Sequence, residues 1–219
     1  MHLAFVTVVL AAVLVPSLAN FGGDIATNVT QSQFECAVNY GWQFVIVRSY
    51  HSYGAPDTNA PIALAAAKAA GIQYRDVYHF PCLTVDPIQQ VTDNVNAVGA
   101  SNFGTLWFDI EVNPSPGCGW ADPMTNCNFL QSMIQAGNNL GLTMGVYSSA
   151  YEWNIVMGNC TAGAEANLPL WYAHFDNTKS FNDFSPFGHW QQPAMKQYTD
   201  ADASATLCGF SADGDWYPN

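Results

Sequence analysis

The sequence contains few charged residues and very few basic ones. Charged side chains make up 10% of the 219 residues, and 17 Asp and Glu stand against 5 Lys and Arg, for a formal net charge of -12. Such a chain lacks the positive field that attracts nucleic acids, and anionic surfaces repel it at neutral pH. We therefore expect no nucleic-acid partner and no membrane partner. Apolar residues make up 49%, which excludes a disordered chain.

Several motifs of known chemistry are also missing. No H-E-x-x-H or similar spacing groups the histidines, so we expect no metal site and no cofactor. His79 and His174 are better interpreted as core or rim residues. No G-x-S-x-G is present, which argues against a Ser-His-Asp hydrolase. The glycine-rich phosphate turn of a doubly wound nucleotide-binding sheet is absent as well.

One apolar run, at the N-terminus, has the length of a targeting signal. Residues 3–15 are apolar but too few to span a bilayer comfortably, and the small residues Ser17 and Ala19 follow. This pattern is typical of a secretory signal cleaved after Ala19, the alternative being a buried first strand. We expect residues 1–19 to be a signal peptide and residues 20–219 to form one domain. The protein would then be secreted or lysosomal/phagosomal, and we expect a monomer.

Six cysteines follow this segment, and their even number predicts three disulfides in an oxidising compartment. Six cysteines allow 15 pairings, among which the sequence does not choose. Residues 28–30 and 159–161 match the glycosylation sequon. The cysteines are Cys36, Cys82, Cys118, Cys127, Cys160 and Cys208.

Strand-like and helix-like runs alternate along the rest of the chain, which predicts parallel β/α units. About eight strands in some 200 residues favour an irregular (β/α) barrel of the TIM-barrel type with fewer helices than strands. A doubly wound open sheet is the alternative. The expected strands are 21–26, 44–47, 74–80, 105–112, 143–147, 168–175, 194–198 and 211–216. The expected helices are 32–40, 61–70, 86–98, 127–140 and 150–157, and residues 179–192 show neither period.

The stretch LWFDIEVN, residues 106–113, places two acids in a hydrophobic strand. Asp109 and Glu111 are two residues apart, so in a strand both side chains point to the same side. Barrel active sites lie at the carboxyl ends of the strands. Two carboxyls that share a poorly solvated pocket cannot both ionise easily. One protonated acid beside one carboxylate is the pair of groups that a glycosidase uses to break a glycosidic bond. The alternative is a solvated or ion-paired strand end.

Seven segments in the right order resemble the family 25 glycoside hydrolases, which are lysozymes. The resemblance covers nearly the whole chain after residue 19. It implies a barrel enzyme that cleaves the bond after N-acetylmuramic acid in bacterial peptidoglycan. The segments are GGDIA, VYHFP, WFDIE, GVYSS, LPLWYAHFD, KQYTD and SADGDWY.

The resemblance also implies the roles of four acids. Glu111 would be the general acid, and Asp109 would orient the 2-acetamido group of the substrate. Asp24 and Asp213 would complete the acidic pocket. Asp215 stands where the family more often has an uncharged amide, so the assignment of Asp213 and Asp215 stays open.

Four aromatic residues in the resembling segments are candidates for sugar binding: Tyr78, Tyr147, Trp171 and Tyr198. Two other functions remain as alternatives. One is a chitinase-like hydrolase, although Thr105 and Trp107 stand where chitinases carry further acids. The other is a glycan-binding lectin on the same fold, which would predict the loss of an acid that is present here.

Overall fold

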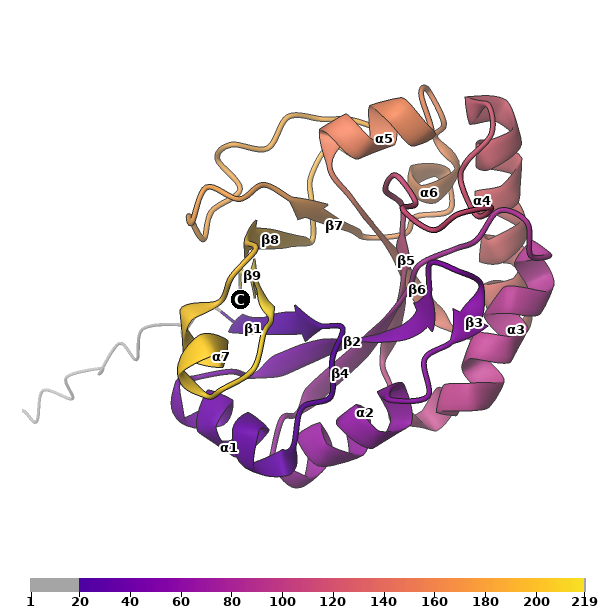
Figure 1. Ribbon diagram of the computed structural model, residues 1–219. Helices are drawn as coiled ribbons and strands as arrows, with labels where there is room; N and C mark the ends of the chain where they lie inside the picture. Colours follow the sequence, from indigo (N-terminus) through magenta and orange to yellow (C-terminus); the bar gives the residue numbers. More distant parts are fainter. Residues whose placement is uncertain (1–19, 219) are drawn as a thin grey trace, which may run out of the picture.

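Eight strands close into a barrel in the computed structural model, which describes residues 20–218 (Figure 1). The expected signal peptide, residues 1–19, lies outside the described residues. The strand order around the barrel is β1-β9-β8-β7-β6-β5-β4-β2, and pairing of β1 with β2 closes it. A two-residue strand, β3, pairs with the end of β2. The strands are β1 (Asn20–Ile25), β2 (Phe44–His51), β3 (Ala55–Pro56), β4 (Tyr74–His79), β5 (Thr105–Asp109), β6 (Thr143–Ser148), β7 (Leu170–Ala173), β8 (Met195–Thr199) and β9 (Asp213–Tyr217).

Seven α-helices and one 3-10 helix connect the strands within the described residues. The four longest, α1 to α4, lie on the outside of the ring of strands, and no helix separates β7 from β8 (Figure 1). The barrel therefore has fewer helices than a regular (β/α) barrel, which confirms the predicted fold class. The helices are α1 (Gln31–Asn39), α2 (Ala60–Ala69), α3 (Pro87–Val98), η1 (Ala100–Asn102), α4 (Pro123–Asn139), α5 (Ala150–Val156), α6 (Ala162–Glu165) and α7 (Ala203–Leu207).

The last strand departs from the expected parallel pattern. β9 runs antiparallel to both β8 and β1, whereas the other barrel strands pair in parallel. A parallel return would need a connection as long as a strand. The segment between β8 and β9 holds only α7, which has five residues. The chain therefore re-enters the barrel from the end at which it left.

Two expected boundaries are wrong for physical reasons. Helix α4 begins at Pro123 rather than Cys127, because Asp122 caps it by accepting from the amides of Met124 and Thr125. Strand β5 ends at Asp109 rather than Val112. The sequence analysis also missed the short elements β3, η1, α6 and α7.

The barrel has two apolar cores. One lies between the sheet and the outer helices, and the other fills the barrel interior. Gly145 on β6 makes room for the interior, since a Cβ there would lie 2.3 Å from the ring of Trp107. The interior residues are Phe44, Ile46, Trp107, Tyr147, Trp171 and Met195. These apolar side chains fill the middle of the barrel. The polar side chains that could bind or react with a ligand lie at the end where the pocket opens.

Three disulfides join all six cysteines, as the even count predicted. Cys36–Cys208 ties α1 to the residue after α7, across 172 positions of sequence. Cys127–Cys160 ties α4 to the segment after α5, across 33 positions. Among residues 20–218 there is no helix with the length and hydropathy needed to cross a membrane.

Breaking the long disulfide should destabilise the fold more than breaking the short one. Loop-closure entropy predicts a loss of about 5 kcal/mol for a Cys36→Ser, Cys208→Ser variant and about 4 kcal/mol for Cys127→Ser, Cys160→Ser. Thermal unfolding of both variants beside the wild type measures the order. Equal melting temperatures for the Cys36→Ser, Cys208→Ser variant and the wild type would contradict the expectation.

Candidate active site

A pocket of about 230 Å³ opens at the carboxyl ends of the barrel strands. Five acids line it: Asp24 on β1, Asp109 at the end of β5, Glu111 in the loop after β5, Asp200 in the segment after β8, and Asp213 on β9. All of them except Asp200 were singled out from the sequence. Three of the four predicted aromatic residues, Tyr78, Tyr147 and Trp171, line the same pocket.

Glu111 lies two residues past the end of β5, and hydrogen bonds hold the backbone of residues 110–112. The amide of Ile110 donates to the carbonyl of Tyr147 at 2.9 Å. The carbonyl of Glu111 accepts from Trp120 Nε1 at 2.7 Å, and the amide of Val112 donates to a Glu152 carboxyl oxygen at 2.8 Å. These side chains replace the strand ladder, which explains why β5 ends early. They also fix the backbone from which the Glu111 side chain extends.

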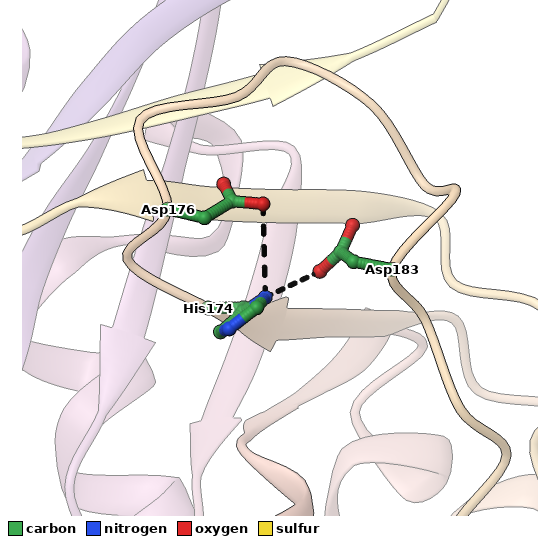
Figure 2. A group of neighbouring side chains, drawn as sticks. All are labelled: His174, Asp176 and Asp183. Carbon is green, nitrogen blue, oxygen red and sulfur yellow. Dashed lines mark hydrogen bonds and ion pairs between the residues drawn. The ribbon is translucent and has the colours of Figure 1, made fainter.

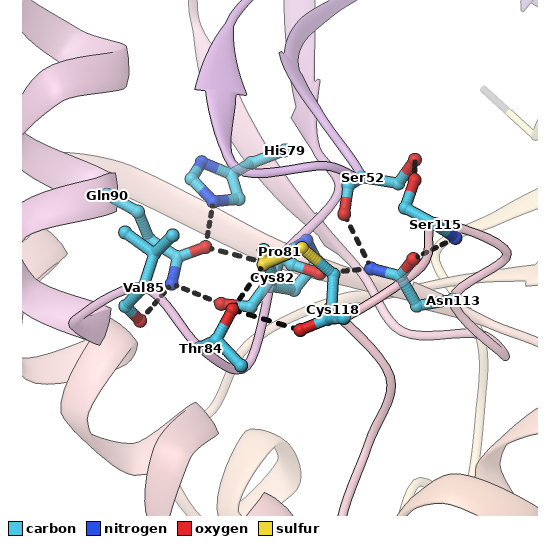
Figure 3. The surroundings of a disulfide bond; sticks show 11 residues. Ser52, His79, Pro81, Cys82, Thr84, Val85, Gln90, Asn113, Ser115 and Cys118 are labelled. Carbon is cyan, nitrogen blue, oxygen red and sulfur yellow. Dashed lines mark hydrogen bonds between the residues drawn. A yellow bond between two sulfur atoms is a disulfide. The ribbon is translucent and has the colours of Figure 1, made fainter.

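The loop after Glu111 is fastened to the segment after β4 (Figure 3). The disulfide Cys82–Cys118 joins the two segments. Asn113 Nδ2 donates to the carbonyls of Ser52 and Pro81, both at 2.8 Å. The loop therefore forms a fixed rim beside Glu111, although its shape could not be predicted from the sequence.

Burial raises the pKa of Glu111 to about 7, and repulsion from Glu152 and Asp213 adds to the effect. A carboxyl with this pKa keeps a substantial protonated fraction at neutral pH and can donate its proton. Asp109 lies deeper and is 5% exposed. Burial followed by repulsion from Glu111 and Asp24 raises the pKa of Asp109 well above its usual range. Its Oδ1 atom is buried and has no hydrogen-bond partner among the described residues. Asp109 lines the pocket, so this unpartnered oxygen is the acceptor there that still lacks a hydrogen bond.

Gln197 connects the walls of the pocket. Its Nε2 donates to Asp24 at 2.7 Å and to Asp213 at 3.2 Å. Its Oε1 accepts from the Tyr147 hydroxyl at 2.6 Å. The adjacent Tyr198, predicted to bind sugar, is not among the residues that line the pocket. Side chains alternate along β8, so Tyr198 points outward, where its hydroxyl donates to Asp202 at 3.4 Å.

Asp213 and Asp215 occupy different levels of β9. Asp213 lines the pocket, and burial followed by repulsion from Asp200 raises its pKa to about 6. Asp215 is fully buried beneath the pocket, where Oδ1 accepts from Trp171 Nε1 at 2.9 Å. Asp213 is therefore the pocket acid of the two.

Asp215 is buried close to Asp24 within this network. Its Oδ2 is buried and has no hydrogen-bond partner among the described residues, and the Asp24 carboxyl lies close enough to influence its charge. Two neighbouring carboxyls can hydrogen-bond to each other only when one of them carries a proton. Burial, then the charge of Asp24, raises the pKa of Asp215 well above its usual range. Burial and Asp213 raise the pKa of Asp24 to about 7. Asp215 therefore keeps its proton to higher pH than an exposed carboxyl does.

His174, Asp176 and Asp183 converge near the pocket in a group that resembles a metal site (Figure 2). His174 Nδ1 lies 2.6 Å from Asp183 Oδ2 and 3.7 Å from Asp176 Oδ2. The buried Lys196 ammonium already lies 2.9 Å from both carboxylates. Burial opposes ionisation of Asp183, but hydrogen bonds from Lys196, His174 and Tyr172 lower its pKa to about 2. The group is an ion-pair network that holds the loop between β7 and β8.

This geometry defines a class of protein. Carboxyls gathered at the carboxyl ends of barrel strands, one of them protonated near neutral pH, are the arrangement of a barrel glycosidase. A family model described as "Lysozyme-like protein 1" matches residues 16–198. The chain belongs to the family 25 glycoside hydrolases, the lysozymes, and it is a glycoside hydrolase.

The relatives come from distant organisms. The chain is 40% identical over 200 residues to "Probable GH family 25 lysozyme 2" of Dictyostelium discoideum, covering 90% of each. It is 35% identical over 219 residues to "Lysozyme-like protein 5" of Caenorhabditis elegans, covering 98% of each. Its fold is similar to the muramidase from Trichobolus zukalii, with a TM-score of 0.74, 21% identity, and coverage of 92% of this chain and 94% of that one.

Besides Asp200, sequence reasoning missed two residues that bear on the site. Gln197 faces the pocket beside the outward Tyr198, and strand alternation within KQYTD pointed to one of the two but not to which. Glu152 lies on α5, far from Glu111 in sequence, and only the fold brings its carboxyl to the amide of Val112.

Replacing Asp215 by Asn should make stability less sensitive to alkaline pH. A group whose folded pKa is raised stabilises the fold at acid pH, and that stability is lost as pH rises through the folded pKa. An acid that stays protonated in the fold but ionises on unfolding lowers the free energy of unfolding by about 1.4 kcal/mol per pH unit. Asn keeps an acceptor for Trp171 and a donor for Asp24.

Melting temperatures at pH 5 and pH 8 measure this effect, with Asp93→Asn on α3 as the control. The wild type and the control should lose more stability between the two pH values than Asp215→Asn does. An equal loss in all three proteins would show that Asp215 is ionised in the fold.

Proposed function

We propose that the protein hydrolyses the β-1,4 bond between N-acetylmuramic acid and N-acetylglucosamine in bacterial peptidoglycan. The observation that carries the proposal is the pairing of Glu111, whose pKa is raised to about 7, with Asp109, whose buried Oδ1 has no partner. Similar structures include muramidases and an autolysin, LytC from Streptococcus pneumoniae, in complex with a synthetic peptidoglycan ligand. These similar structures support the choice of substrate.

Glu111 is the general acid in this proposal. Its proton moves to the glycosidic oxygen as the bond from that oxygen to the anomeric carbon breaks. The oxygen of the substrate's own 2-acetamido group attacks the anomeric carbon and forms a cyclic intermediate. Asp109 accepts the acetamido N–H through its unpartnered oxygen and holds the group in line. Water then opens the ring, and Glu111 takes up its proton.

Asp24 and Asp213 are proposed to bind the reacting sugar from the opposite wall. Both accept from Gln197 and keep oxygens toward the pocket. Tyr78, Tyr147 and Trp171 are proposed to surround the same sugar. Because Tyr147 and Trp171 are themselves hydrogen-bonded, to Gln197 and Asp215, these walls are fixed before substrate enters. Such preorganisation favours charge stabilisation in the transition state.

We also propose that the protein works as a monomer outside the cytosol, in a secreted or lysosomal/phagosomal setting. Three disulfides support an oxidising compartment. A general acid that must be protonated suits an acidic compartment.

Glu111→Gln should abolish wall lysis and leave the fold intact. Gln has the shape of Glu but no proton to give, and general acid catalysis contributes about 10²–10⁴-fold. The rate at which Glu111→Gln lyses purified walls is compared with the rate for Glu35→Gln, a control that makes the same change on the exposed face of α1. Near wild-type lysis by Glu111→Gln protein with a native circular-dichroism spectrum would refute the role.

Activity should fall as pH rises through about 7, because the Glu111 pKa lies near this value and the protonated form is the active one. Glu152→Gln removes a repulsion that raises this pKa, so it should move the alkaline limb of the profile to lower pH. The measurement is kcat/KM against pH at fixed ionic strength. An optimum above neutral pH, or an unmoved limb in Glu152→Gln, would argue against this assignment.

Walls from which the acetyl groups of muramic acid have been removed should be very poor substrates. The attacking oxygen belongs to that group, so the loss should far exceed the worth of one hydrogen bond, about 0.5–1.5 kcal/mol. Mass analysis of released sugars measures the rate. Normal turnover of such walls, or a sugar attached covalently to Asp109, would contradict the substrate-assisted route.

A further inference from the structure

A cavity of about 410 Å³ opens at the amino ends of the parallel strands, at the end of the barrel opposite the acid pocket. Its walls come from the beginnings of β2, β4, β5 and β8 and from the end of the antiparallel β9. Among the described residues, none lines both this amino-end cavity and the acid pocket. Its volume lies within the range of small-molecule sites, and the proposed function makes no use of it.

Four aromatic side chains line the amino-end cavity: Phe44, Tyr74, Trp107 and Tyr217. The rings of Phe44 and Tyr217 are in contact, with centroids 5.1 Å apart. Tyr74 is 52% exposed. The face of an aromatic ring carries partial negative charge and attracts a cation. The rings therefore favour a ligand that is either apolar or positively charged.

Among the described residues that line the cavity, Asp76 alone is charged. Its Oδ1 accepts from the amide of Thr105 at 2.8 Å, and its Oδ2 accepts from Trp107 Nε1 at 3.0 Å. Both donors are neutral, and none of the ion pairs within residues 20–218 includes Asp76. Burial raises the pKa of Asp76, and the hydrogen bonds from Thr105 and Trp107 oppose the rise. The carboxyl is thus held in place without a positive charge beside it.

The neighbours of Asp76 keep the carboxyl in this state. Gly104 leaves room for it, since a Cβ there would lie 2.9 Å from Asp76 Oδ1. Arg75 is the adjacent basic residue, but successive side chains of a strand point to opposite faces. Its guanidinium donates instead to the carbonyls of Ile72 and Gln73. Burying a carboxylate without a cation costs free energy, which a positively charged ligand would offset.

We propose that the amino-end cavity binds a small organic ammonium ion. The ammonium group donates to the Asp76 carboxylate, and the apolar body of the ligand lies against the rings of Phe44, Tyr74 and Tyr217. A neutral apolar molecule would contact the same rings but leave Asp76 without a cation, and an anion would be repelled. The proposal does not depend on the reaction at the acid pocket.

The test uses phenethylammonium as the probe and 2-phenylethanol as its uncharged analogue of the same shape. Calorimetry at pH 7 measures the affinity of each for the wild type. Asp76→Asn removes the charge, and Asp93→Asn on α3 makes the same change outside the cavity. Tyr74→Ala removes an exposed ring from the wall. Its control is Tyr40→Ala, because Tyr40 is 51% exposed and lies outside the cavity.

The wild type should bind phenethylammonium at least about tenfold more tightly than 2-phenylethanol, and Asp76→Asn should remove this preference. Tyr74→Ala should weaken binding of the cation severalfold, whereas both controls should match the wild type. Melting temperatures show whether Asp76→Asn is folded, and if it is not, Tyr74→Ala and the pair of probes still decide. Equal affinity for the two probes would overturn the proposal in favour of an apolar ligand. No binding of phenethylammonium, or unchanged binding in both cavity variants, would overturn it outright.

Discussion

Repulsion among buried acids is the constraint on which this site depends. Asp24, Asp109, Glu111, Asp213 and Asp215 crowd one end of the barrel, and none of the ion pairs within residues 20–218 involves them. The chain has only five Lys and Arg. Arg48 and Lys196, for example, pair with Asp57, Asp176 and Asp183 instead. With no cation to compensate them, the acids can stay buried only by keeping protons. The scarcity of basic residues therefore helps to keep the general acid protonated.

The barrel keeps these acids close to one another and fixes the side chains around them. Hydrogen bonds from Trp171, Gln197 and Tyr147 run beneath and across the pocket. The disulfide and Asn113 fix the rim beside Glu111. The loop network that pairs Lys196 with Asp176 and Asp183 also forms part of the wall of a second cavity, which shares Glu111 with the pocket and is lined by aromatic residues such as Tyr151 and Phe184. The uncompensated acids therefore line one cavity, and the loop held by the Lys196 ion pairs lines the other.

The sequence was informative where a pattern reports local geometry. Alternation within WFDIE placed Asp109 and Glu111 on one side of the chain, and alternating strands and helices predicted the barrel. It was uninformative where the answer lies in long-range packing. The pairing of six cysteines, the antiparallel β9 and the approach of Glu152 to Val112 depend on contacts between distant segments. Tyr198 is a different case, because the resemblance pointed to the KQYTD segment, and only the fold shows that Gln197 rather than Tyr198 lines the pocket.

Protonation of the acid cluster is the central claim, and a titration of carboxyl carbons by nuclear magnetic resonance tests it most directly. With Asp and Glu labelled with ¹³C, each pocket acid is assigned by its Asn or Gln variant and followed from pH 4 to pH 8. The account predicts that Glu111 titrates near pH 7 and that Asp215 titrates well above the pH at which an exposed carboxyl does. Ionisation of all five acids near pH 4, as in an exposed carboxyl, would contradict it.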